Sequence, residues 1–331
     1  MESRRRENRE RARKISRFIR REERRLKLKY PFLRYQNVLG LSIFLFSAGW
    51  MLLASWLYWV GIIPTWCVVI TNALAASLLH ELEHDLIHGL YFKGRFLEKL
   101  LMYSVWVLRG NTPNPFYRRK IHLLHHRESG QFSDIEEQMI GNGMKWGIRR
   151  LLTMLDHNLS FLLNARRVAK RAKELDLNEM AKASFPVMWF FYAGLYGFIS
   201  IQLLLLFGQE QPSFMPYLEF FFYVYVLPNF IRQGSLQIVS SNMHYFGDIL
   251  PGKDGLFEQT QILRPFWLWP LQLFCFNFGT THSLHHFVVH QPFYLRQMVA
   301  IRAIPYMIRQ GIRHNDTASI LRANRYLPEV G

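Results

Sequence analysis

Long uncharged stretches alternate along the chain with strongly charged ones. Residues 35–80 contain no Lys, Arg, Asp or Glu, a run of 46 positions. As a single helix this stretch would be about 69 Å long, more than twice the roughly 30 Å hydrocarbon core of a bilayer. Gly61 and Pro64 interrupt it near the middle. The pattern therefore predicts a hairpin of two membrane-spanning helices, over residues 36–59 and 63–82.

Two further apolar stretches predict a second hairpin. Residues 183–209 are again free of charged side chains, and a fourth apolar stretch begins near Pro216 and continues past Glu219 towards Phe246. The short turn 210–216 between them contains two prolines. The hydrophobic pattern thus predicts an all-α integral membrane protein with about four transmembrane helices.

The remaining segments are too short or too interrupted to cross a bilayer. Amphipathic pieces near 96–108 and 147–163 predict helices that lie at the interface or pack beside the site. Residues 265–281 are apolar but broken by prolines, which favours an interfacial or re-entrant segment. The tail from residue 299 alternates apolar residues with arginine, as an amphipathic surface helix does. Together these pieces predict a helical cap on the membrane helices.

Basic residues are confined to three segments, which predicts the orientation in the membrane. Residues 1–34, 81–182 and 232–331 hold 15, 17 and nine of the 41 Lys and Arg, whereas the turns at 60–64 and 208–216 hold none. The positive-inside rule then assigns both termini and every histidine to the cytoplasmic side. This topology accounts for the net charge of +17, so we expect no nucleic-acid partner.

Charge and hydropathy divide the chain into three parts. We expect a basic cytoplasmic N-terminal arm over residues 1–34, a membrane domain over 35–290 and an amphipathic C-terminal tail over 291–331. The arm is either a solvated helix or a segment that lies on anionic lipid headgroups. Cys67 and Cys275 lie in separate apolar stretches, which fits a reducing compartment rather than a disulfide framework.

Histidine is concentrated in four short motifs on the predicted cytoplasmic side. The motifs are His80-Glu-Leu-Glu-His84-Asp-Leu-Ile-His88, His122-Leu-Leu-His125-His126, Asn242-Met-His244-Tyr-Phe-Gly247 and His282-Ser-Leu-His285-His286. Residues three and four apart share one face of a helix, so the rings of a motif can converge on one centre. Because neutral imidazole is the commonest metal ligand, this spacing predicts a metal site.

The number of rings predicts two metal ions. We take nine of them as ligands: His80, His84, His122, His125, His126, His244, His282, His285 and His286, with His88 as an additional candidate. Nine nitrogens exceed what one tetrahedral or octahedral ion accepts. A nitrogen-rich metal pair at a membrane face suits O2 activation and attack on an unactivated C–H bond. We therefore expect iron, although the ligands alone leave zinc and manganese open.

The motifs resemble those of the membrane-bound fatty acid desaturase and hydroxylase superfamily, which has three histidine boxes and a further His before the third. They are also similar to motifs of the membrane alkane hydroxylases. The resemblance spans residues 35–290 and implies two iron ions, O2 as co-substrate and a lipid or fatty acyl substrate among membrane lipids. It implies desaturation of an acyl chain or, alternatively, hydroxylation of a fatty acid, alkane or lipid. An external electron donor of the ferredoxin, cytochrome b5 or rubredoxin type is implied as well.

The chain departs from these relatives in three respects. Many of them carry an Asn four residues before the isolated His, where this chain has Ser240, and Asn242 lies only two residues before His244. The first motif is shorter than that of acyl-CoA desaturases. No His-Pro-Gly-Gly motif of a fused cytochrome b5 domain is present, so the resemblance points to a separate donor. Acidic residues near the motifs either orient the rings through their second nitrogen or are solvated: Glu81, Glu83, Asp85 and Asp248.

Two other functions compete with this interpretation. His80-Glu81-x-x-His84 matches the motif of zinc metalloproteases, and an intramembrane zinc protease is a distant alternative because it leaves most of the other histidines unused. A metal or haem carrier needs paired histidines on facing spans, whereas these lie in loops on one side. The number and kind of bound metal distinguish the three functions.

Overall fold

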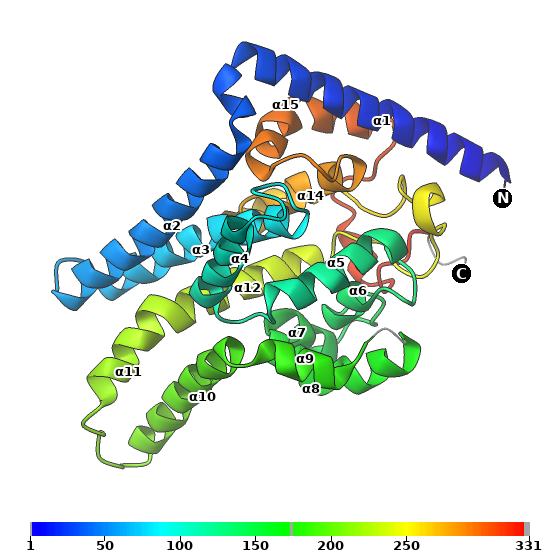
Figure 1. Ribbon diagram of the computed structural model, residues 1–331. Coiled ribbons are helices and arrows are strands. Elements are labelled where there is room, and N and C mark those ends of the chain that lie inside the picture. The colour runs from blue at the N-terminus through cyan, green and yellow to red at the C-terminus, as the bar shows by residue number, and fades with distance from the viewer. Residues whose placement is uncertain (1, 173–174, 328–331) are drawn as a thin grey trace.

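The computed structural model describes residues 2–172 and 175–327. Within these ranges the chain is helical and contains no β-strand, only two isolated bridges of one residue pair each. This agrees with the all-α prediction. The helices form a slender group of long, apolar helices at one end of the molecule and a broader cap at the other (Figure 1).

Three helices of the described chain are long and apolar enough to cross a membrane: α2 (Gln36–Trp59), α3 (Thr65–Ile87) and α10 (Val187–Leu206). They correspond to the first three predicted spans. The turn between α2 and α3 is built around Gly61, whose φ of 76° is a conformation that glycine adopts without strain.

The fourth predicted span is helical but divided into three pieces. It consists of α11 (Met215–Phe221), the π-helical turn η2 (Phe222–Val226) and α12 (Leu227–Ser240). Pro228 at the start of α12 lacks the N–H that would bond to the carbonyl of Val224. Asn72 of α3 donates to that carbonyl instead, at 2.8 Å. Because each piece is shorter than a span, a fourth membrane crossing stays a prediction.

The cap is assembled from shorter helices that follow the hairpins. They are α4 (Phe96–Arg109), α5 (Pro115–Glu128), α6 (Ile135–Met139), α7 (Ile148–Leu155), α8 (His157–Arg171), α9 (Leu177–Ser184), α13 (Trp269–Phe274), α14 (Phe278–Phe287) and α15 (Phe293–Arg309). The described chain also has four short 3-10 turns, one between α1 and α2, two between α12 and α13 and one after α15: η1 (Pro31–Arg34), η3 (Gly252–Asp254), η4 (Phe266–Leu268) and η5 (Thr317–Ile320). Figure 1 shows the turns of both hairpins pointing away from this cap.

The basic N-terminal arm is a 28-residue helix, α1 (Glu2–Lys29), packed along the edge of the cap (Figure 1). Its apolar face, with Ile15 and Ile19 fully buried, covers α15. Ser16 donates from Oγ to the carbonyl of Phe287 at 3.2 Å. The arm is thus a folded element held against α14 and α15. Most of its arginines are exposed, whereas Arg4 forms an ion pair with the buried Glu258 of the cap at 2.7 Å.

α3 lies at the centre of the fold and carries the first histidine motif. It packs against α2, α4, α5 and α12, and every residue from Leu79 to Ile87 is buried. Its buried carboxylates are paired with arginines from other helices: Glu81 and Asp85 with Arg296 of α15, and Glu83 with Arg109 and Arg118. These pairs remove the cost of isolated buried charges and hold the end of α3 in place.

Candidate metal centre

Nine histidines from four segments form two compact groups. The first histidine group contains His84, His88, His122, His126 and His285, and the second contains His125, His244, His282 and His286. Within each group the nitrogens that face inward lie within 4.8 Å of one another. α3, α5, α14 and the loop after α12 each contribute, so sequence-distant motifs converge on one place.

Four Nε2 atoms of the first histidine group form a closed ring. The contacts are His88 to His122 at 3.1 Å, His122 to His126 at 3.2 Å, His126 to His285 at 2.9 Å and His285 to His88 at 3.1 Å. A ring nitrogen carries at most one proton, so hydrogen bonds satisfy at most two of the four contacts. A square of this size has its centre about 2.2 Å from each corner, close to a metal–imidazole bond length. The ring therefore fits a metal ion better than it fits hydrogen bonding.

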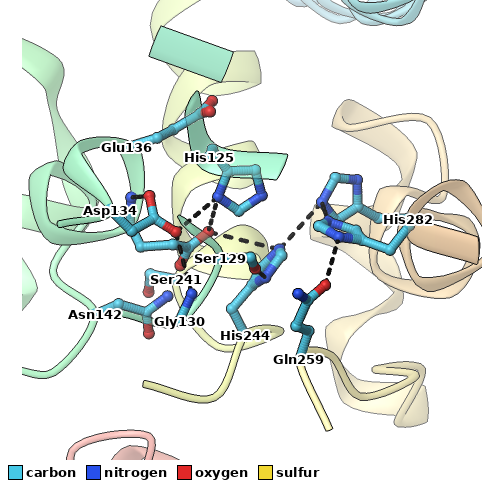
Figure 2. Close-up of polar contacts among 12 residues, drawn as sticks. His125, Ser129, Gly130, Asp134, Glu136, Asn142, Ser241, His244, Gln259 and His282 are labelled. Carbon is cyan, nitrogen blue, oxygen red and sulfur yellow. Dashed lines mark hydrogen bonds and ion pairs between the residues drawn. The ribbon is translucent and has the colours of Figure 1, made fainter. Parts of the chain in front are cut away.

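The second histidine group has a similar spacing. Nε2 of His282 lies 3.1 Å from Nε2 of His244 and 3.1 Å from Nε2 of His286, and Figure 2 shows the first of these contacts. The ring of His125 completes the group, with its centroid 4.8 Å from that of His244. With four or five imidazoles in each group, the donor set fits two nitrogen-rich metal sites of the kind that iron occupies.

Oxygen atoms hold the outer nitrogen of three rings. His122 contacts Glu136 at 2.8 Å, His125 contacts Asp134 at 2.9 Å and His286 contacts Gln259 at 3.3 Å, all through Nδ1. Such contacts fix the ring so that Nε2 faces the metal. Figure 2 shows Asp134 beside His125. Of the acidic residues proposed from sequence for this role, Glu81 lies 3.4 Å from Nδ1 of His80 and Asp85 lies 4.0 Å from Nδ1 of His84, and both also pair with Arg296. Glu83 pairs with Arg109 and Arg118, and Asp248 accepts from the backbone of Tyr326 and Leu327.

Burial sets the protonation of most of the rings. It lowers the pKa of His126, His285 and His286 well below the ordinary value, so these rings stay neutral, as metal ligands must. His125 behaves differently. Burial lowers its pKa, but the charge and hydrogen bond of Asp134 outweigh this and raise the pKa to about 10. The surroundings of His125 thus favour a positive charge, which a metal ion supplies.

The first histidine motif contributes differently from the prediction. Eight of the nine predicted ligands lie in the two groups, but His80 lies in neither, and the additional candidate His88 lies in the first group. The Nδ1 of His80 is 3.4 Å from Glu81 Oε1, and the side chain lines a cavity instead. Both pairs of neighbouring histidines in this motif are four residues apart, so spacing did not distinguish the pair His80–His84 from the pair His84–His88. Which of them bind metal stays a prediction.

A mainly apolar cavity of about 530 Å³ leads to both histidine groups. Two rings of each group line its inner end: His84 and His122 of the first, His125 and His282 of the second. Its outer end, here called the mouth, is lined by four exposed residues of α8 and α10: Leu162, Trp189, Ala193 and Tyr196. Sequence reasoning did not reveal this cavity, because its lining comes from many separate segments.

Sequence comparison agrees with this geometry. Residues 62–317 match the fatty acid desaturase family, a stretch that includes every residue of both histidine groups and most of the cap. No curated protein matches the chain. α1 and the whole of α2 precede the matched region. The chain therefore belongs to the fatty acid desaturase family, whose members are oxidoreductases of the membrane.

Proposed function

We propose that the protein uses two iron ions and O2 to desaturate the acyl chain of a fatty acid or lipid. The observation that carries this proposal is the meeting of two histidine groups at the inner end of an apolar cavity. A volume of about 530 Å³ is in the range of small-molecule sites. Such a cavity holds an alkyl chain in a fixed position beside the metal pair and excludes bulk water.

When bound, the metal pair would activate O2, the oxidant that removes hydrogen from an unactivated carbon, with the external donor supplying the remaining electrons for its reduction. The protein itself holds the metal ions, orients their ligands and shields the substrate from bulk water. The histidines hold the metals, Asp134, Glu136 and Gln259 orient three of the rings, and the cavity wall positions the substrate carbon. Desaturation and hydroxylation of the same chain both fit this arrangement, and we propose hydroxylation as the alternative outcome.

The position of the mouth supports a substrate that resides in the membrane. Trp189, Ala193 and Tyr196 lie on an exposed flank of α10, one of the three candidate spans. A chain that enters between α8 and α10 would therefore come from the bilayer.

We further propose that both termini and the metal centre lie on the cytoplasmic side, where an external one-electron donor supplies the reducing equivalents.

The zinc protease alternative has less support. Its motif requires His80 and His84 to face one ion with Glu81 as the base. In this structure His80 lies outside both histidine groups, and Glu81 lies 3.3 Å from the guanidinium of Arg296. A carboxylate in a buried ion pair is poorly placed to activate water.

Expression in a bacterial host followed by mass spectrometry of the total lipids tests the proposal. We expect the wild type to introduce a double bond, or a hydroxyl group for the alternative, into host acyl chains. His285→Ala removes one corner of the nitrogen ring and should abolish the new product at equal protein levels. A product that persists in His285→Ala would contradict the assignment of the metal centre.

A further inference from the structure

Glu137 of α6 is a buried carboxylate that faces the second histidine group. The residue is 2% exposed, and its Oε1 lies 3.5 Å from Nε2 of His244 and 3.8 Å from Nδ1 of His125. Its Oε2 has no hydrogen-bond partner among the described residues. The side chain also lines the cavity that leads to the metal centre. Glu137 is therefore a buried carboxyl group directed at the site without a conventional partner.

Known interactions do not explain this carboxylate. No Lys or Arg of the described chain forms an ion pair with it, although an isolated buried charge is costly. His125 Nδ1 is already engaged by Asp134, 0.9 Å closer than Glu137. Nε2 of His244 is the nitrogen that faces His282 inside the group. When that nitrogen ligates a metal it carries no proton, so two electron-pair donors face each other across 3.5 Å. A cation between them would make the contact favourable.

The two histidine groups also differ in their number of ligands. The first has five rings and the second has four. The position where many relatives have an Asn holds Ser240, and the amide of Asn242 is occupied in donating to the carbonyl of Ile238 at 2.7 Å. Neither side chain supplies an evident fifth ligand to the second group. The Oε1 atom of Glu137 lies 3.5 Å from Nε2 of His244, a spacing compatible with two ligands of one metal ion.

We propose that Glu137 is a tenth ligand, which binds the metal of the second histidine group through its carboxylate. This inference rests on the proposed dimetal centre. It makes the two sites unequal, because one has only neutral nitrogen donors and the other adds one negative oxygen. An anionic oxygen donor favours iron or manganese at this site and strengthens its hold on the metal.

Metal binding by three variants tests the proposal without any need for substrate. Glu137→Gln keeps the shape of the side chain and removes its charge, Glu137→Asp keeps the charge and shortens the reach, and Glu128→Gln is the matched control. Glu128 contacts Arg127 and Ser133 and no imidazole. Each purified protein is titrated with Co2+ in detergent, with bound metal measured by mass spectrometry and ligand number followed by visible absorption.

We expect the wild type and Glu128→Gln to bind two Co2+ ions. Glu137→Gln should bind the second ion at least tenfold more weakly, with a changed absorption spectrum as the ligand number falls, and Glu137→Asp should lie between them. Wild-type affinity and spectrum in Glu137→Gln would overturn the assignment. If that variant does not fold, Glu137→Asp decides: an altered spectrum supports ligation, and an unaltered one overturns it. A wild type that binds fewer than two ions would instead contradict the dimetal centre itself.

Discussion

His80, His84 and His88 show what residue spacing predicts and what it leaves open. Their interval of four places three rings along one face of α3, which correctly indicated a cluster. Which two of the three rings join the first histidine group depends on the position along α3 at which α5 and α14 pack against it. In the structure α5 and α14 pack beside His84 and His88, whose ring centroids lie 4.3 Å and 4.6 Å from that of His285. The sequence alone does not give this packing position.

Alanine substitutions at the two ends of the motif separate these roles. His88→Ala removes a corner of the nitrogen ring and should reduce bound metal from two ions to about one per protein. His80→Ala should retain two ions, because His80 lies outside both groups. Elemental analysis of the purified variants provides the measurement. Loss of metal in His80→Ala with retention in His88→Ala would show that the first motif is used as the sequence first suggested.

Arg296 provides a residue-scale test of stability. Its guanidinium lies 2.9 Å from Asp85 and 3.3 Å from Glu81, and all three side chains are buried. Arg296→Met would leave two buried carboxylates unpaired, so we expect a loss of about 3–5 kcal/mol in the free energy of unfolding. Denaturation in detergent measures it.

Arg302 on the same helix is the matched control for that experiment. Its side chain is 58% exposed and lies 3.6 Å from Glu22. Glu22 is buried but keeps its closer ion pair with Arg25 at 2.8 Å. Loss of the exposed Arg302 partner should cost about 0–1 kcal/mol, so Arg302→Met should change stability little. Equal losses of unfolding free energy in the two variants would mean that the buried ion pairs of Arg296 stabilise the fold no more than the contact of the exposed Arg302.

At the scale of elements, hydropathy predicted the uncharged helices better than the charged ones. α2 begins and ends where the pattern placed the first span, whereas α3 extends five residues further, through the charged half of its motif. Pairing with arginines of α4, α5 and α15 makes that extension possible. The fourth stretch was read as one span because composition does not reveal a π-helical turn. Pro228, which lacks a donor, was the available signal.

α10 supplies the element-scale prediction. Ala193 lies at the mouth, so Ala193→Trp should obstruct it and reduce product from long acyl chains at least tenfold without loss of bound metal. Ser200→Trp, on an exposed part of the same helix away from the cavity, serves as the control. Lipid mass spectrometry at matched expression provides the comparison. Equal product from both variants would argue against this route to the metals.

At the scale of the whole molecule, the distribution of charge predicts a single orientation. Both hairpin turns lack Lys and Arg and point away from the cap that carries the histidines (Figure 1). After Cys67 and Cys275 are replaced by serine, Ser213→Cys should react with an impermeant maleimide in intact cells. Lys145→Cys in the cap should react only after permeabilisation. The reverse pattern would place the metal centre outside the cytoplasm.

The convergence of the motifs was predicted from the number and spacing of the histidines and from their location on one predicted side of the membrane, and the resemblance supported it. The residues that orient the rings were not predicted. The partners that orient the rings, Asp134, Glu136 and Gln259, lie outside the histidine motifs. Only the packing of α6 and the loop before α13 brings them to the rings, so no local pattern marked them.

The location of the mouth on a flank of α10 has a kinetic consequence. If substrate enters laterally from the bilayer, the substrate concentration that the enzyme experiences is the concentration of acyl chains within the membrane. Turnover would then follow the mole fraction of the reactive lipid in the membrane. Adding more vesicles of unchanged composition would leave the rate of each enzyme molecule as it was, and diluting the reactive lipid with an inert one would lower it.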